Sequence, residues 1–73
     1  MNQAQKQRLR FIDCILEHYG KLNRSAIEDY FGISTPQASL DIAKYVSAVP
    51  NNIYYNASKK TYERGLKFER WLP

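Results

Sequence analysis

Residues 25–49 read SAIEDYFGISTPQASLDIAKYVSAV, which predicts a short helix, a tight turn at Gly32 and a second, longer helix. Two helices joined by three or four residues that include a glycine are typical of a helix-turn-helix. The second helix of that motif enters the major groove of duplex DNA. This stretch therefore predicts both the centre of the fold and a surface for DNA.

Two signals mark the start of the second helix. Ser34 can cap it, because a serine oxygen accepts from an unpaired amide of the first turn, and the Gln37 side chain can reach back to the Ser34 amide. Pro36 lies in the first turn, where a missing N–H has no cost and the fixed φ suits a helix. Pro50 stops the helix, so we expect it to cover residues 35–49.

At about 100° per residue, the second helix has two distinct sides. Ala38, Ile42, Tyr45 and Val49 share one side, which we expect to pack on the other helices. The opposite side and its flank hold candidate DNA-binding residues, which are Thr35, Pro36, Gln37, Ser39, Leu40 and Lys44, together with Ala43 and Ser47. Asp41 lies between the two sides, and we expect it to be structural, bonded to Arg24 or to a backbone amide.

The side chains on the candidate side match the groups that DNA offers. Gln37 suits the N6 and N7 atoms of adenine, and the hydroxyls of Thr35 and Ser39 suit bases or phosphates. Leu40 suits a thymine methyl group, and Lys44 suits a phosphate or a guanine. This side also lacks acidic residues, so the pattern predicts that helix 35–49 reads the major groove.

Apolar spacing predicts an earlier helix over about residues 3–19. The residues that form its apolar stripe are Leu9, Phe11, Ile12, Ile15, Leu16 and Tyr19. Gly20 follows directly, as expected where a residue in the left-handed conformation closes a helix.

Residues 21–24 should connect this helix to the next one. Ser25 forms a second capping-box pattern with Glu28, although Asn23 is an alternative cap. The residues expected to point inward from the short helix and the turn are Ile27, Tyr30, Phe31 and Ile33.

Beyond Pro50, two β-prone runs, 53–55 and 61–63, flank a loop rich in turn residues and predict a hairpin. A hairpin directly after the recognition helix is the wing of a winged helix. We expect the 56–60 wing, with Lys59 and Lys60, to contact the DNA backbone or an adjacent minor groove. If Tyr55 pairs near Lys60, then Ile53, Tyr55 and Tyr62 share the inner face.

The last residues of the sequence are too apolar to form a tail without contacts. Phe68 should return to the core, and Trp71 and Leu72 should either cover the core or mark a surface for a partner.

Size and composition place the chain among small basic domains. Its 73 residues suit a single domain over 1–73, and the net charge of +4 favours polyanionic partners. The lone Cys14 and the single His18 predict neither a disulfide nor a metal site, and no cofactor is indicated. No signal peptide or membrane-spanning run is evident, so we expect a cytoplasmic protein with no membrane partner.

Spaced residues along nearly the whole chain resemble the N-terminal winged helix-turn-helix of WYL-domain transcriptional regulators, especially the repressors that accompany phage-defence operons. The residues that carry the resemblance are Asn23-Arg24-Ser25, Phe31-Gly32-Ile33-Ser34, Pro36-Gln37-Ala38-Ser39, Asp41, Tyr45, Pro50-Asn51-Asn52, Tyr55, Ser58, Lys60 and Tyr62. The chain is similar, more distantly, to DeoR-type winged helices.

The resemblance implies a homodimer that binds operator DNA, and it places Ser34, Gln37 and Ser39 on the DNA. One departure is that such regulators continue into a ligand-sensing WYL domain, which this sequence lacks. Effector sensing is therefore not carried over, and we expect no small-molecule ligand within this chain. The chain is then either an isolated DNA-binding part of a longer regulator or a free-standing small regulator.

These patterns favour a sequence-specific double-stranded DNA-binding regulator, a repressor that occupies an inverted repeat as a dimer. The alternative is a winged-helix module for protein–protein interaction, with Leu40 or Trp71 as its anchor. An RNA binder would need aromatic residues on an exposed sheet, and Tyr54 alone keeps that reading open. An enzyme is not indicated, because no nucleophile with a nearby base or carboxylate pair is evident.

Overall fold

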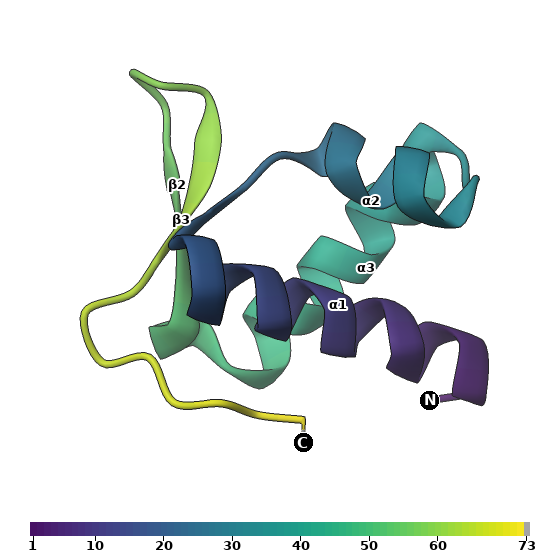
Figure 1. Cartoon of the computed structure of the whole chain (residues 1–73), viewed down its shortest axis with the longest axis horizontal. Coiled ribbons are helices and arrows are strands. Elements are labelled where there is room, and N and C mark those ends of the chain that lie inside the picture. Colours follow the sequence, from purple (N-terminus) through teal and green to yellow (C-terminus); the bar gives the residue numbers. More distant parts are fainter. Residues whose placement is uncertain (73) are drawn as a thin grey trace.

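The computed structural model describes residues 1–72. Within this range the chain forms three α-helices, α1 (Gln3–Tyr19), α2 (Arg24–Phe31) and α3 (Thr35–Ala48), and a short 3-10 helix, η1 (Pro50–Asn52). It also forms three strands, β1 (Lys21–Leu22), β2 (Ile53–Asn56) and β3 (Thr61–Arg64) (Figure 1). The predicted, mostly helical winged helix-turn-helix is confirmed.

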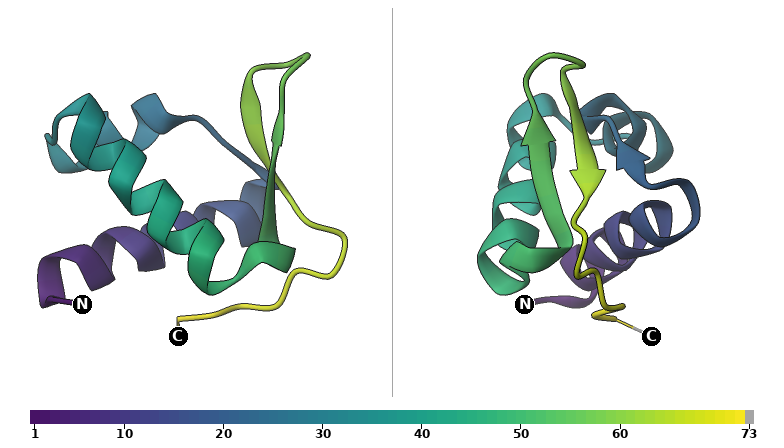
Figure 2. Two further views of the ribbon diagram at one scale, coloured as in Figure 1. Left: turned by 180° about the vertical axis from the view of Figure 1, so that it is seen from behind. Right: turned by 90° about the vertical axis from the view of Figure 1, so that its left-hand side faces the viewer.

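The sheet has one strand more than the predicted hairpin. Its order is β1-β3-β2, with both pairings antiparallel (Figure 2). The segment expected to be a plain connection pairs Lys21 with Glu63 and Leu22 with Tyr62. Leu22 is buried there, so β1 ties the end of α1 to the base of the wing.

The hairpin register differs from the one considered from the sequence. Tyr55 lies opposite Tyr62 rather than near Lys60. Because side chains alternate along a strand, Ile53, Tyr55 and Tyr62 do share a face. Only Ile53 is fully inside, and Tyr55 is 52% exposed. The expectation that Tyr55 is buried was therefore wrong, because the outer half of the hairpin extends beyond the helices (Figure 1).

The helices bury the faces that their spacing predicts, with two exceptions. Their fully buried apolar residues are Leu9, Ile12, Leu16, Ile27, Ala38, Ile42 and Tyr45. Tyr19 and Tyr30, which were expected to point inward, are 73% and 70% exposed. Tyr19 ends α1 beyond the reach of the other helices, and Tyr30 stacks on Phe11 at the surface, with ring centroids 4.6 Å apart. Phe31 and Ile33 are half-buried against the core.

Local signals at the helix ends operate mostly as expected. Gly20 and Gly32 close α1 and α2 with φ of 76° and 64°, a left-handed conformation that costs glycine little. Ser34 caps α3 by accepting from the Gln37 backbone N–H at 3.3 Å. The second capping box is absent, since α2 starts at Arg24 with Asn23 at its cap position and no side-chain bond from it.

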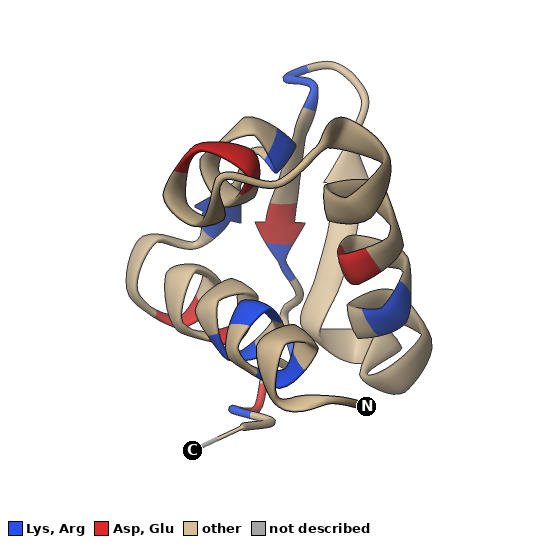
Figure 3. Cartoon of the chain, turned by 90° about the vertical axis from the view of Figure 1, so that its right-hand side faces the viewer, with Lys and Arg blue, Asp and Glu red and all other residues tan. Residues whose placement is uncertain are grey.

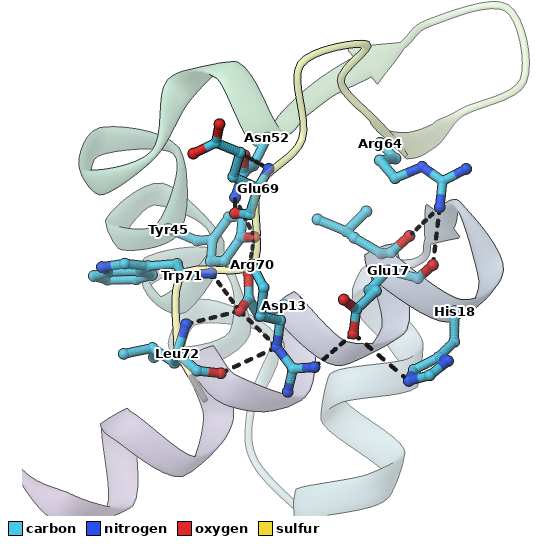
Figure 4. Close-up of polar contacts among 11 residues, drawn as sticks. Asp13, Glu17, His18, Tyr45, Asn52, Arg64, Glu69, Arg70, Trp71 and Leu72 are labelled. Atoms are coloured by element: carbon cyan, nitrogen blue, oxygen red, sulfur yellow. Dashed lines mark hydrogen bonds and ion pairs between the residues drawn. The ribbon is translucent and has the colours of Figure 1, made fainter.

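The C-terminal segment folds back along α1 and the end of α3. The backbone N–H groups of Trp71 and Leu72 both donate to Asp13 Oδ2 at 2.8 Å, and Asn52 exchanges two hydrogen bonds with the Glu69 backbone (Figure 4). Leu72 is buried, and Trp71 and Phe68 are half-buried against the core. Of the two roles considered for the tail, the structure thus shows that it covers the core.

None of the helices formed by residues 1–72 has the length and apolar character needed to cross a membrane.

Candidate nucleic-acid interface

The side of α3 that faces solvent carries the residues predicted from the helical spacing. Leu40 is 63% exposed, although burial of a leucine side chain would contribute about 1.5–3 kcal/mol. The other exposed residues on this side and at its start are Ser34, Thr35, Pro36, Ala43, Lys44 and Ser47. Gln37 and Ser39 are half-buried at the edges. We call this set the outer side of α3.

The one acidic residue of α3, Asp41, is fully buried and points away from the outer side. Its carboxylate accepts from Arg8 Nε at 2.6 Å and Nη2 at 3.4 Å, and from Gln37 Nε2 at 3.1 Å. Its structural role is therefore confirmed, but neither of the expected partners, Arg24 or a backbone amide, is the one found. Arg8 on α1 is the partner, so the pair joins α1 to α3 and leaves no acidic group on the outer side.

The Gln37 side chain also departs from the capping box. It donates to Asp41 one turn along the helix instead of reaching back to the Ser34 amide. A buried carboxylate with an open lone pair is the stronger acceptor, because hydrogen bonds to ionised groups are about twice as strong as neutral ones.

Arg24, at the start of α2, belongs to this surface and was missed as a candidate. Its Nη1 donates to Ser39 Oγ at 3.2 Å, and its Nε lies 3.6 Å from Glu28 Oε2. The other Glu28 oxygen accepts from Thr35 Oγ1 at 2.8 Å. Glu28 therefore bonds one residue on each side of the turn, Arg24 and Thr35, and the positive charge of Arg24 neutralises its negative charge. The sequence signal that could have identified Arg24 as a candidate is its position at the start of the helix before the turn.

Lys59 and Lys60 lie at the exposed tip of the hairpin, where the basic positions are seen in Figure 3. Asn56 shapes this turn, because its Oδ1 accepts from the Lys59 backbone N–H at 3.1 Å. Lys60 takes a φ of 55°, the left-handed region. The tip projects beyond the helices on the side where α2 and the start of α3 lie (Figures 1 and 2).

A hollow of about 340 Å3 separates the start of α2 from the hairpin. Arg24 and Lys60 lie on opposite walls, and Tyr55 and Tyr62 form its hairpin side with ring centroids 4.9 Å apart. Glu28, which pairs with Arg24, also lines the hollow. The hollow thus lies between the helix-turn-helix and the wing, with one basic residue from each.

One acidic residue, Glu63, lies within the hairpin, and neighbouring side chains donate hydrogen bonds to its carboxylate. Glu63 accepts from Tyr54 Oη at 2.8 Å and from Asn56 Nδ2 at 3.1 Å. These bonds, that from Tyr54 first, lower the pKa of Glu63 below its usual range, and the same bond raises the pKa of Tyr54. The Tyr54 hydroxyl is therefore bonded to β3, while the rings of Tyr54 and Tyr55 remain half exposed.

Residues 1–72 contain no group of three His, Cys, Asp or Glu side chains that could hold a metal ion. Cys14 is half-buried on α1, and His18 is exposed, with its Nε2 3.7 Å from Glu17 Oε1.

Comparisons with known proteins agree with the winged helix-turn-helix fold. A family model described as the BrxR transcriptional regulator winged helix-turn-helix domain matches residues 4–72. A DNA-binding transcriptional repressor CapW of Escherichia coli (strain KTE188) is 45% identical over 66 residues, which are 90% of this chain and 22% of that protein. A CapW repressor of Pseudomonas aeruginosa is 42% identical over 70 residues, 96% of this chain and 23% of that protein. The chain thus spans about a fifth of the length of these curated relatives.

Proposed function

Because the chain belongs to the family of BrxR transcriptional regulator winged helix-turn-helix domains, we propose that it binds double-stranded DNA in a sequence-specific manner and acts in transcriptional repression. The observation that carries the proposal is the outer side of α3, where Leu40 is exposed and the only acid of the helix is buried against Arg8. The similarity to DNA-binding repressors supports the same reading.

The proposal assigns different roles to the helix and the wing. The α3 residues that would read bases or contact phosphates are Ser34, Thr35, Pro36, Gln37, Ser39, Leu40 and Lys44. At the wing, Lys59 and Lys60 would bind phosphate or enter an adjacent minor groove. Arg24 joins them as a phosphate contact, since it lies beside Ser39 and faces the hollow that Lys60 also lines.

A single helix-turn-helix reads few base pairs, so we propose that two copies bind an inverted repeat as a symmetric dimer. Occupation of a promoter would then block transcription. This activity belongs to the cytoplasm, where a bacterial repressor meets its operator.

Fluorescence anisotropy with a labelled duplex tests the proposal. Binding should weaken steeply as salt rises, because each neutralised phosphate releases condensed counterions and contributes about 0.9 to the log–log slope. A chain that shows no salt-dependent binding to any duplex would refute the proposal.

A further inference from the structure

Gln37 is the one glutamine of α3, and its side chain is held before any DNA is bound. Its Nε2 donates to Asp41 Oδ1 at 3.1 Å, and Asp41 is fully buried. The second carboxylate oxygen of Asp41 accepts from Arg8 Nε at 2.6 Å. A chain of contacts therefore runs from α1 through the interior to a side chain at the edge of the outer side of α3.

The chemistry of this chain of contacts fixes the orientation of the amide. A guanidinium offers only donors, so both oxygens of Asp41 act as acceptors toward their neighbours. An acceptor can engage the Gln37 amide only through Nε2. The oxygen Oε1 and the second N–H remain available toward the groove.

We propose that Arg8 and Asp41 are positioning residues that set which edge of the Gln37 amide faces DNA, and that they thereby select adenine at one position of each half-site. Adenine presents an N6 donor and an N7 acceptor in the major groove, which match a free Oε1 and a free N–H. The inference rests on the proposed DNA binding and adds the base that this site reads. A glutamine held in place also loses less freedom on binding than one that is mobile.

Replacing Asp41 by Asn reverses the pattern while keeping the size of the side chain. The Asn oxygen keeps the place of Oδ2, which accepts the shorter bond from Arg8 Nε at 2.6 Å. Its Nδ2 then takes the place of Oδ1, gives up the 3.4 Å contact with Arg8 Nη2 and becomes a donor toward Gln37. Gln37 then turns its Oε1 inward and presents Nε2 to the groove. A donor edge favours guanine or thymine, which offer acceptors in the major groove.

Selection of bound sequences from a random duplex library tests this directly, with the unaltered chain, D41N and Q37A compared side by side. The unaltered chain should enrich adenine at one position per half-site, and Q37A should lose that preference alone. D41N should lower the adenine preference at the same position by about tenfold or more, the size of one bidentate pair, and favour guanine or thymine there. Base preferences at other positions and the salt slope should not change. If Asp41 had a merely structural role, D41N would not change the preference at this one position alone.

A measurement on the unaltered chain covers the case in which D41N does not fold. The side-chain amide protons of Gln37 should lie outside the chemical-shift range of a solvent-exposed glutamine amide and exchange with water more slowly than those of the exposed Gln7. Gln37 signals that match those of Gln7 would overturn the inference.

The selection also separates this inference from the proposed function. If Q37A changes no base preference, or if D41N keeps the adenine preference, the inference fails although the chain still binds DNA. If no duplex is enriched at all, the proposed function fails first and the inference fails with it.

Discussion

Replacing Tyr45 by Phe removes one oxygen atom from the buried network that joins α1, α3 and the C-terminal segment (Figure 4). The Tyr45 hydroxyl donates to Asp13 Oδ1 at 2.5 Å and accepts from Asn52 Nδ2 at 3.2 Å. Tyr45 and Asp13 are both fully buried, so water cannot replace the lost partner without entering the core.

The expected cost follows from the type of bond that is lost. A hydrogen bond to a charged group contributes about 1.5–3 kcal/mol. Asn52 keeps its bonds with the Glu69 backbone, so the loss of its bond to the Tyr45 hydroxyl adds little to the cost. We expect Y45F to lower the free energy of unfolding by about 2–3 kcal/mol, which corresponds to about 10 °C or more in the thermal midpoint of a domain of this size.

Thermal unfolding followed by circular dichroism measures this change, and Y54F is the matched control. Tyr54 also donates to a carboxylate, that of Glu63 at 2.8 Å, but on the exposed side of the hairpin. Y54F should therefore unfold close to the midpoint of the unaltered chain. Equal midpoints for Y45F and Y54F would show that the buried network contributes no more than a surface bond, contrary to this reasoning.

Three further predictions concern charged groups. L40E should abolish duplex binding in anisotropy, because it places a carboxylate on the outer side of α3, and it should not lower the thermal midpoint. The control L66E, in the exposed loop after β3, should bind normally. Loss of binding in both variants would point to net charge instead. Alanine at Lys44 or at Lys59 should each reduce the log–log salt slope by about 0.9 if each contacts one phosphate, and unchanged slopes would remove that lysine from the interface. Burial, followed by the bond to Asp13, raises the pKa of Tyr45 above its usual 10, so the folded chain holds this proton more tightly than the unfolded chain. The free energy of unfolding should therefore be full below pH 10 and fall as the pH rises above it, less steeply in Y45F. Chemical denaturation measures this, and an equal fall in the unaltered chain and in Y45F would contradict the assignment.

The parts of the fold that were predicted correctly rest on local signals. Ser34, Pro36 and Pro50 bound α3, and the spacing of Ala38, Ile42 and Tyr45 shows which side of it is buried. These signals lie within a few residues of the structure that they specify. The exposure of the candidate DNA-binding side follows from them.

The parts that were missed depend on contacts between distant residues. Asp41 and Arg8 are 33 positions apart, and helical spacing gives the direction of each side chain but not its partner. Strand β1 has only two residues, too few to show alternation, and it exists because β3 offers it an open edge.

The tyrosines that were expected inside show a second limit of periodicity. Tyr19 and Tyr30 lie where spacing predicts a buried position, yet the neighbouring elements do not extend far enough to cover them. An amphipathic aromatic residue tolerates such an edge, so its sequence position gives no warning.

The most direct test of the central claim is an NMR titration of the isotope-labelled chain with a duplex recovered by the selection. Backbone amides of residues 34–47 and of the tip, residues 56–60, should shift strongly, while those of residues 66–72 stay in place. Shifts confined to the C-terminal segment, with α3 unaffected, would contradict the assignment of α3 as the element that reads DNA.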